Sequence, residues 1–313
     1  MRRIVVVGTG FFGRLIARRL ADQGIVFVLA SRRGPDAQID VEDRRSIARV
    51  LRPADVVVDT AGPFQTRSTY LVEAAIARGC DVVDLSDAQD FARRVSELHE
   101  RAVAADVRIV TSCSAIVTVA AAAVTRSAVA SPTDCDIFLA PASAETGSPA
   151  TVRSFVHSLG GWSRTKPFPR ERRSGHHVDS SASLLLPASW PTLGRVDFWV
   201  DPNAFLASPA FAIASRISPL RALITLTAPL GRVLGRRDGV FAVTVRDGAT
   251  EVTVRLSAPR RSYLVAAEPA AMVAAALARA ERMPAGIVPA RAHVDADELF
   301  ERLRSLGVSL ELR

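Results

Sequence analysis

The chain has 313 residues, of which 49% are hydrophobic and 23% are charged. This composition is typical of a globular protein and excludes a disordered or fibrous one, and the length favours two domains. The formal net charge is +8, but the arginines are spread over the whole chain and only 6% of the residues are aromatic. A nucleic-acid surface needs clustered basic and stacking residues, so nucleic acid is not an expected partner.

The cysteines and the apolar segments indicate in which cellular compartment the protein is expected. Cys80, Cys113 and Cys135 match neither a disulfide framework nor a metal site, which favours a reducing cytoplasm. Glycines from Gly8 onward interrupt the apolar N-terminus, which is too short for a signal peptide. Arginines and prolines interrupt the apolar residues 204–234, so a membrane-spanning helix of ~20 residues is not expected. This segment is interpreted as an amphipathic helix at a domain or subunit interface, with association to a membrane surface as the alternative.

The first third of the chain alternates between short β-branched runs and helical patterns. Strands that alternate with helices need right-handed crossovers and form a parallel sheet that is covered on both faces. Residues 1–113 are therefore predicted to form an α/β domain of the Rossmann type. The pattern predicts strands at 4–7, 25–30, 55–59, 81–85 and 107–110, and helices at 12–20, 67–78 and 91–102.

Residues 114–262 are predicted to form a second domain of the α+β class. Residues 240–256 are expected to be an antiparallel hairpin, because Asp247-Gly248 is a strong turn signal between two runs of alternating apolar and polar residues. This domain is therefore expected to contain an antiparallel or mixed sheet. Its other predicted elements are a helix at 117–129 and strands at 135–139 and 196–200.

Residues 263–313 return to helical patterns and are expected to pack back on the first domain. Asp295 followed by Glu298 resembles a capping box, which predicts the start of a helix. Residues 160–182 are rich in Gly, Arg and His and contain two prolines, and they are predicted to form a long loop.

A glycine motif begins directly after the first predicted strand. Gly8-Thr9-Gly10-Phe11-Phe12-Gly13 has the G-x-G-x-x-G spacing and opens a helix, and in this context it predicts a dinucleotide site. Gly8 permits a tight turn, Gly10 lets the backbone approach a pyrophosphate, and Gly13 allows close packing of helix and strand. The phosphates are expected at the positive N-terminus of that helix.

The end of the second strand predicts which dinucleotide binds. An NAD site usually has an acidic residue ~20 positions after the glycines, whereas this chain has Ser31-Arg32-Arg33 there. A hydroxyl and two guanidinium groups suit the 2′-phosphate of NADP, which arginine binds through charge-assisted hydrogen bonds. NADP is therefore expected in preference to NAD, and Asp36 lies too far into the next loop to be the first choice as a ribose ligand.

Two further segments are candidates for contact with the cofactor. Asp40 precedes the helix expected after the second strand, where it either accepts a hydrogen bond from the adenine or caps the helix. Small residues after a strand let the chain pass close to the nicotinamide. The residues in this position are Ala61, Gly62, Pro63 and Phe64.

Asp84 and Asp87 end the next strand, at the carboxyl edge where open α/β sheets bind ligands. Each carboxylate either contacts the substrate or has a structural role. Asp87 is the candidate catalytic residue. Lys166 with His176 and His177 is either a second acid/base set or part of a solvated loop, and the histidine pair lacks a third ligand, so no metal is expected.

The glycine motif, residues 59–64 and residues 79–87 together resemble the saccharopine dehydrogenase-like, or saccharopine reductase-like, family. The resemblance covers residues 1–115, and residues 286–289 with the capped helix that follows are similar to the family's tail. It implies an NADP-binding Rossmann domain, a mixed-sheet second domain used for dimerisation, and hydride transfer to or from a C–N bond. A homodimer that acts on a small-molecule substrate is therefore expected.

Three classes of function stay open from the sequence. The first is an NADP-dependent oxidoreductase that acts on an imine or carbonyl substrate. The second is a reductase of a lipid-linked double bond, with the apolar residues 204–234 lining its site. The third is an NADP-binding module without catalytic activity, because no residue is unmistakably catalytic.

Overall fold

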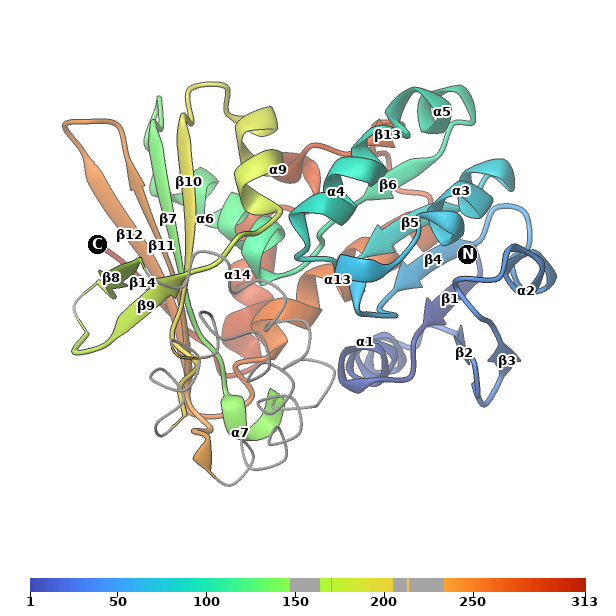
Figure 1. Ribbon diagram of the computed structural model, residues 1–313, viewed down its shortest axis with the longest axis horizontal. Helices are drawn as coiled ribbons and strands as arrows, with labels where there is room; N and C mark the ends of the chain where they lie inside the picture. The colour runs from blue at the N-terminus through green and yellow to red at the C-terminus, as the bar shows by residue number, and fades with distance from the viewer. Residues whose placement is uncertain (147–163, 170, 205–212, 214–233) are drawn as a thin grey trace.

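The computed structural model of the protein describes residues 1–146, 164–169, 171–204, 213 and 234–313. Two seven-stranded sheets, A and B, lie on either side of a layer of helices (Figure 1). The N-terminus lies on the side of sheet A and the C-terminus on the side of sheet B (Figure 1). The chain therefore has the α/β architecture with a second sheet that the sequence predicts.

Sheet A is parallel throughout, with the order β13-β6-β5-β4-β1-β2-β3. From β3 to β6 this is the strand order of the Rossmann fold, which confirms the prediction. The strands are β1 (Ile4–Val7), β2 (Phe27–Ser31), β3 (Ala37–Gln38), β4 (Val56–Asp59), β5 (Asp81–Asp84), β6 (Arg108–Val110) and β13 (Gly286–Ile287).

Both faces of sheet A are buried, as its continuous β-branched runs require. Val5 and Val57 pack on one side with helices α2 (Arg44–Val50), α3 (Tyr70–Ala77), α4 (Gln89–Ser96) and α5 (His99–Ala104). Ile4 and Val56 pack on the other side with α1 (Phe11–Asp22) and α13 (Leu264–Ala278). Since α13 comes from the last fifty residues, the C-terminal part of the chain completes the first core.

Two predicted helices of this region differ from the structure. The helix predicted over 91–102 is two helices, because the chain turns at Leu98, whose amide bonds the carbonyl of Val95. The four apolar residues that predicted it are nevertheless all buried. The helix predicted over 67–78 begins only at Tyr70, after a short 3-10 turn, η1 (Phe64–Thr66).

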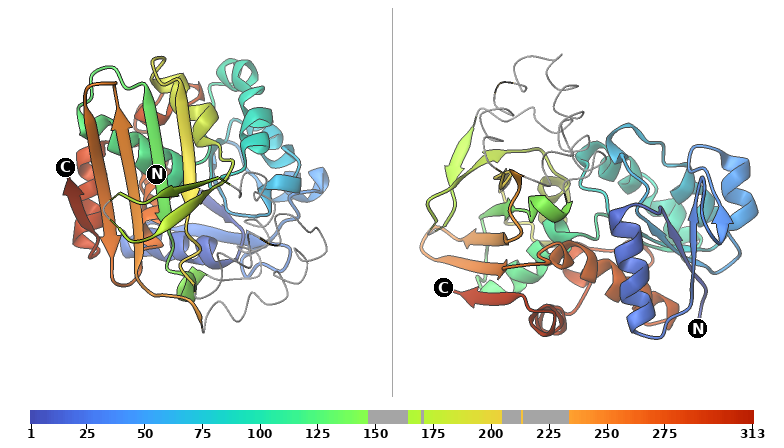
Figure 2. Two further views of the ribbon diagram at one scale, coloured as in Figure 1. Left: turned by 60° about the vertical axis from the view of Figure 1, so that its left-hand side comes forward. Right: turned by 90° about the horizontal axis from the view of Figure 1, so that it is seen from below.

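Sheet B is mixed, with the order β14-β12-β11-β7-β10-β9-β8. Strands β11 (Gly239–Arg246) and β12 (Glu251–Ala258) form the predicted antiparallel hairpin. The sheet is not wholly antiparallel because β7 (Asp134–Ala140) and β10 (Arg195–Val200) pair in parallel. The inner face of sheet B packs against the helix layer, so that this layer serves both sheets (Figures 1 and 2).

The helix layer begins after sheet A with a π-helix, η2 (Ala115–Val119), and continues as α6 (Ala120–Ser127). The helix predicted over 117–129 is therefore helical in most of its length but starts with wider turns. Asp295 caps α14 (Ala296–Ser305) by accepting a hydrogen bond of 2.9 Å from the amide of Glu298, as the capping box predicts. After α14 the chain adds β14 (Ser309–Leu312) to sheet B.

The long loop predicted over 160–182 is partly regular. Within its described residues, β8 (Thr165–Pro167) and β9 (Ser174–His177) form a hairpin that extends sheet B beside β10, and α9 (Ala182–Ser189) follows. The hairpin is stabilised by contacts with residues distant in the sequence, which its own residues do not reveal. Phe168, between the two strands, is buried against Phe138 and Trp199 on the outer face of sheet B.

Candidate functional site

The glycine motif forms a tight connection between β1 and α1. Gly8 has φ +110°, and a Cβ at Gly13 would lie 1.9 Å from the carbonyl oxygen of Gly8, so neither position accepts a side chain. Thr60 closes the turn from the side of β4, because its hydroxyl donates a 2.9 Å hydrogen bond to the carbonyl of Val7. A Cβ at Gly10 would meet nothing within 4 Å. Gly10 therefore faces open space at the N-terminus of α1.

The start of α1 fits an anionic group such as a pyrophosphate. Gly10 is the N-cap residue, no side chain caps the helix, and its first turn contains no acidic residue. The amides of a helix N-terminus carry partial positive charge and attract phosphate. The Phe11 ring, in the same turn, contacts Tyr263 with 5.0 Å between ring centroids. Tyr263 precedes α13 and was not predicted from the sequence, because it lies some 250 residues from the motif.

Ser31, Arg32 and Arg33 lie where the sequence places them, at the carboxyl end of β2. The Ser31 hydroxyl accepts a hydrogen bond of 3.2 Å from Thr9, which ties this end of β2 to the glycine turn. Arg32 and Arg33 are exposed, and neither forms an ion pair with any residue that the structure describes. Both guanidinium groups are therefore available to an incoming anion. Asp36 is engaged elsewhere, since its carboxylate accepts the Leu29 amide at 2.8 Å.

Asp40 does not cap the second helix. Its carboxylate accepts the amide of Glu42 at 3.0 Å, whereas Asp43 is the N-cap of α2 and accepts the amide of Arg45 at 2.9 Å. The interpretation of Asp40 as a helix cap is therefore wrong, because the helix begins three residues later than expected. Its contact with adenine stays a prediction.

The segment of Ala61, Gly62, Pro63 and Phe64 follows β4 at the same edge of the sheet. Phe64 turns its side chain into the core, 5.1 Å from Phe91 between ring centroids, so that only its backbone is available at the edge.

A buried ion pair stabilises this segment. Arg67 forms two hydrogen bonds with the Asp59 carboxylate, of 2.8 and 2.5 Å, and a third of 2.6 Å with the carbonyl of Ala61. Asp59 also accepts the Ala61 amide at 3.1 Å. The sequence signals this pair only in part: a carboxylate that ends a buried strand needs polar partners, but nothing local identifies Arg67 as one of them.

Asp84 ends β5, the next strand of the sheet, and Asp87 follows three residues later. Asp84 is the register partner of Asp59 and is completely buried, and burial raises its pKa to about 6. Asp87 is exposed to solvent, but the protein atoms that crowd its carboxylate raise its pKa to about 6 as well. The Ser114 hydroxyl donates a 2.6 Å hydrogen bond to Asp87. Asp87 is thus an accessible acid whose pKa lies near neutrality.

Ser114 is presented by an unusual stretch of backbone after β6. Ser112 has φ +57°, in the left-handed region that non-glycine residues seldom adopt, and the π-helix η2 starts directly after Ser114. Such backbone strain and π-turns concentrate at functional sites. The sequence did not single out Ser114, since its role depends on a contact with Asp87 across two strands.

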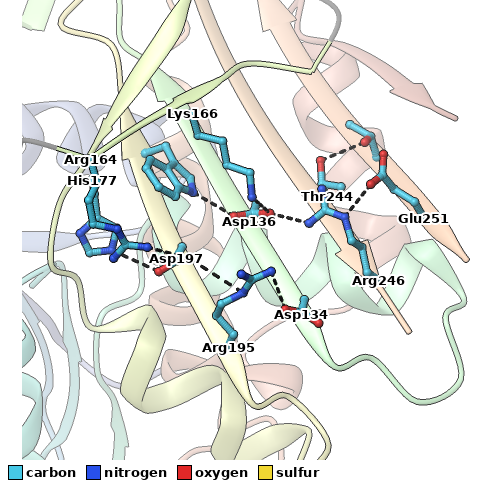
Figure 3. Close-up of polar contacts among 12 residues, drawn as sticks. Asp134, Asp136, Arg164, Lys166, His177, Arg195, Asp197, Thr244, Arg246 and Glu251 are labelled. Atoms are coloured by element: carbon cyan, nitrogen blue, oxygen red, sulfur yellow. Dashed lines mark hydrogen bonds and ion pairs between the residues drawn. The ribbon is translucent and has the colours of Figure 1, made fainter. Parts of the chain in front are cut away.

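Lys166 lies far from this edge. It lies on the outer face of sheet B, where its ammonium contacts the buried Asp136 at 2.5 Å, and Arg246 pairs with the same carboxylate at 2.5 Å (Figure 3). His177 lies 3.2 Å from Asp197 on the same face. The hypothesis of an acid/base set around Lys166 at the substrate site is therefore wrong, because the hairpin directs Lys166 toward a structural carboxylate on the side turned away from sheet A (Figures 1 and 3).

The remaining predictions concern the apolar segment, membrane-spanning helices and metal sites. Residues 204–234 lie almost entirely outside the described residues, so their apolar segment has no structural account here. None of the helices in the described ranges is long and apolar enough to cross a membrane. Within those ranges, no three His, Cys, Asp or Glu side chains are grouped so that they could hold a metal ion.

Comparison with known proteins gives matches to dehydrogenases. In fold, the chain is similar to the DAP dehydrogenase of C. glutamicum in complex with DAP, with 16% identity over 97% of this chain and 98% of that chain and a TM-score of 0.49. It is also similar to the WlbA (WbpB) dehydrogenase from Thermus thermophilus in complex with NAD and UDP-GlcNAcA, with 13% identity over 97% and 95% and a TM-score of 0.43.

An oxidoreductase from Agrobacterium radiobacter in complex with NAD+, L-tartaric acid and magnesium has 10% identity over 98% of both chains and a TM-score of 0.45. The comparison with curated proteins gave no match. Residues 4–110 match the family model of the saccharopine dehydrogenase NADP binding domain, which coincides with sheet A up to β6. This match supports the resemblance of the first domain to the saccharopine dehydrogenase-like family and supports an NAD(P)-dependent oxidoreductase.

Proposed function

We propose that the protein is an NADPH-preferring oxidoreductase that transfers a hydride to or from the carbon of a C=N or C=O bond in a small-molecule substrate. The observation that carries the proposal is that groups suited to the cofactor and to proton transfer lie together at one edge of sheet A. A turn for a dinucleotide follows β1, exposed arginines follow β2, and an accessible acid follows β5. Ligands of open α/β sheets bind at this edge.

The residues of the edge suit the successive parts of an NADP molecule. Open space at Gly10 and the uncapped start of α1 suit the pyrophosphate. Ser31, Arg32 and Arg33 suit the 2′-phosphate, and Asp40 the adenine. The backbone of 61–64 suits the nicotinamide. When bound, NADPH supplies the hydride, so the protein itself has to orient the substrate and manage one proton.

Asp87 is the proposed source of that proton. Reduction of a C=N bond adds a hydride to carbon and a proton to nitrogen, and a carboxylic acid at Asp87 can give this proton and regain it from solvent. A pKa of about 6 keeps part of the carboxyl protonated near neutral pH, where general acids work best. The Ser114 hydroxyl fixes the carboxylate from one side. The homodimer expected from the resemblance stays a prediction.

The cofactor preference is tested by titrating NADPH and NADH and following the change in nicotinamide fluorescence. We expect NADPH to bind more tightly, and Arg32→Ala with Arg33→Ala to remove on the order of 10-fold to 100-fold in NADPH affinity while leaving NADH affinity unchanged, because each lost charged hydrogen bond contributes about 1.5–3 kcal/mol before screening. The control is Arg93→Ala with Arg279→Ala, which removes two exposed charges elsewhere. Equal affinities for the two dinucleotides in the unmodified protein would contradict the preference.

The catalytic role is tested with the oxidation of NADPH by a panel of small ketones, aldehydes and cyclic imines. With a substrate found in this way, Asp87→Asn should slow the single turnover of bound NADPH about 100-fold, the lower end of general acid catalysis. The affinity for NADPH should not change. An unchanged rate would exclude Asp87 as the acid. Oxidation by polyisoprenoid or acyl double bonds alone would favour the lipid reductase, and no turnover with any of these compounds would favour the non-catalytic module.

A further inference from the structure

Asp84 accepts hydrogen bonds from backbone amides outside its own strand. One oxygen, Oδ1, accepts two backbone amides, from Ser86 at 2.9 Å and from Ser112 at 3.0 Å. The carbonyl of Asp84 accepts a third amide, from Cys113, at 2.7 Å. Asp84 is thus bonded to two different segments of chain, the one that follows β5 and the one that follows β6.

These two segments carry the proposed acid and its partner. Ser86 directly precedes Asp87, and Ser112 lies two residues before Ser114. Asp84 therefore connects the backbone on both sides of the 2.6 Å hydrogen bond between Ser114 and Asp87. Because Ser112 has a positive φ, the turn that presents Ser114 needs an anchor, and the amide of Ser112 is anchored on Asp84.

Charge balance alone does not account for Asp84. Its neighbour Asp59 is neutralised by Arg67, whereas Asp84 has no cation of its own, and its second oxygen, Oδ2, has no hydrogen-bond partner among the described residues. The titratable groups that influence its charge are Asp59, Arg67 and the Cys113 thiol, and the neighbouring Thr111 hydroxyl lowers its pKa. A buried, unneutralised carboxylate destabilises a fold, so Asp84 is best explained by what its accepted hydrogen bonds hold in place.

We propose that Asp84 is a positioning residue that keeps Asp87 and Ser114 within hydrogen-bond distance of each other. The inference rests on the proposed function only for its catalytic consequence. The positioning itself is a property of the protein without substrate. An oxygen acceptor at this position is required, and a negative charge is not.

The test compares Asp84→Asn with Asp84→Ala and reads the pKa of Asp87 by carboxyl carbon NMR, with the Asp87 signal assigned from Asp87→Asn. The amide oxygen of asparagine can accept both backbone amides, whereas alanine accepts neither. Ser114 lowers the pKa of Asp87 through its hydrogen bond, so losing that bond raises it. We expect Asp84→Ala to raise the pKa of Asp87 by about one pH unit relative to Asp84→Asn, and Ser114→Ala to raise it equally relative to the unmodified protein.

The double variant Asp84→Ala/Ser114→Ala tests whether Asp84 affects Asp87 only through Ser114. If it does, the pKa of Asp87 in the double variant is no higher than in Ser114→Ala alone. An Asp87 pKa that is equal in Asp84→Ala and Asp84→Asn, while Ser114→Ala raises it, would overturn the proposal. If Asp84→Ala does not fold, Asp84→Ser, with a hydroxyl too short to reach both amides, takes its place.

Turnover provides the catalytic readout. Asp84→Asn should keep the single-turnover rate with the identified substrate within a few-fold, and Asp84→Ala should lower it on the order of 10-fold to 100-fold, as expected for a misplaced acid. The NMR cycle needs no substrate. A failure of Asp87 as the acid would therefore appear in Asp87→Asn turnover alone, and a failure of the positioning role would appear in the NMR cycle alone.

Discussion

His293 makes the stability of the fold depend on pH in the acid range. Its ring is 1% exposed and lies between η2 and the segment that follows β13. Nδ1 lies 2.8 Å from the Thr118 hydroxyl and Nε2 lies 3.1 Å from the carbonyl of Val288. A neutral ring satisfies both contacts, because Nε2 donates to the carbonyl while Nδ1 accepts from the hydroxyl. Burial lowers the pKa of His293 from 6.5 to about 4.

The sign and size of the effect follow from this pKa. Below pH 6.5 the unfolded chain takes up a proton at His293 that the folded chain refuses, so the free energy of unfolding falls as the pH falls toward 4. Between pH 7 and pH 5 the predicted loss is about 2 kcal/mol from this residue alone. The raised pKa values of Asp84 and Asp87 act in the opposite direction, since acidification favours their neutral, folded forms.

Urea unfolding at pH 7 and pH 5 measures this loss, with His293→Gln as the reference. Glutamine offers an acceptor for Thr118 and a donor for Val288 but does not titrate. The two carboxylates are present in both proteins, so the difference between the two pH dependences isolates His293. We expect the unmodified protein to lose about 2 kcal/mol more than the variant. An equal loss in both proteins would refute the reasoning, and it would mean that the ring is protonated inside the fold.

Two further predictions use matched pairs of positions. Gly13→Ala should destabilise the first domain by several kcal/mol in thermal unfolding, because its Cβ would overlap the backbone of Gly8, whereas Gly10→Ala should leave the melting temperature unchanged and weaken NADPH binding on the order of 10-fold; the reverse pattern would contradict the structure of the turn. Asp136→Ala should cost about 3–5 kcal/mol in urea unfolding, because it removes the carboxylate partner of Lys166, leaves Arg246 with Glu251 alone and leaves the buried indole of Trp199 without an acceptor. The partly exposed Asp134→Ala should cost under about 1 kcal/mol. Similar costs for both variants would show that Asp136 is not effectively buried.

Local signals in the sequence predicted the parts of the fold that local physics determines. The apolar runs of β1, β4 and β5 are buried on both faces, and a parallel sheet is the architecture that buries them so. The glycine motif predicted the turn between β1 and α1 because the steric requirements for its glycines arise within that turn. The Asp247-Gly248 hairpin and the Asp295 cap were predicted for the same reason.

The parts that failed depend on contacts between distant segments. Lys166 was assigned to a loop near two histidines, but Asp136, thirty residues earlier in the chain, determines its position. The hairpin that carries Lys166 is stabilised because Phe168 packs against Phe138 and Trp199 on sheet B. Composition within residues 160–182 contains no information about that sheet. The same holds for Ser114, which only the alignment of β5 and β6 brings to Asp87.

Positive and negative groups lie toward opposite ends of the carboxyl edge of sheet A. The strand order puts the exposed arginines after β2 on one side of the positive start of α1 and the carboxylates of Asp59, Asp84 and Asp87 on the other. A dinucleotide with a 2′-phosphate has the same polarity, since its phosphates are negative and its oxidised nicotinamide ring is positive. Asp59 is neutralised by Arg67, so among the described residues the negative charge without a cation lies at the end of β5. The cofactor would therefore be oriented by the whole edge, with the nicotinamide placed toward the strand that carries the proposed acid.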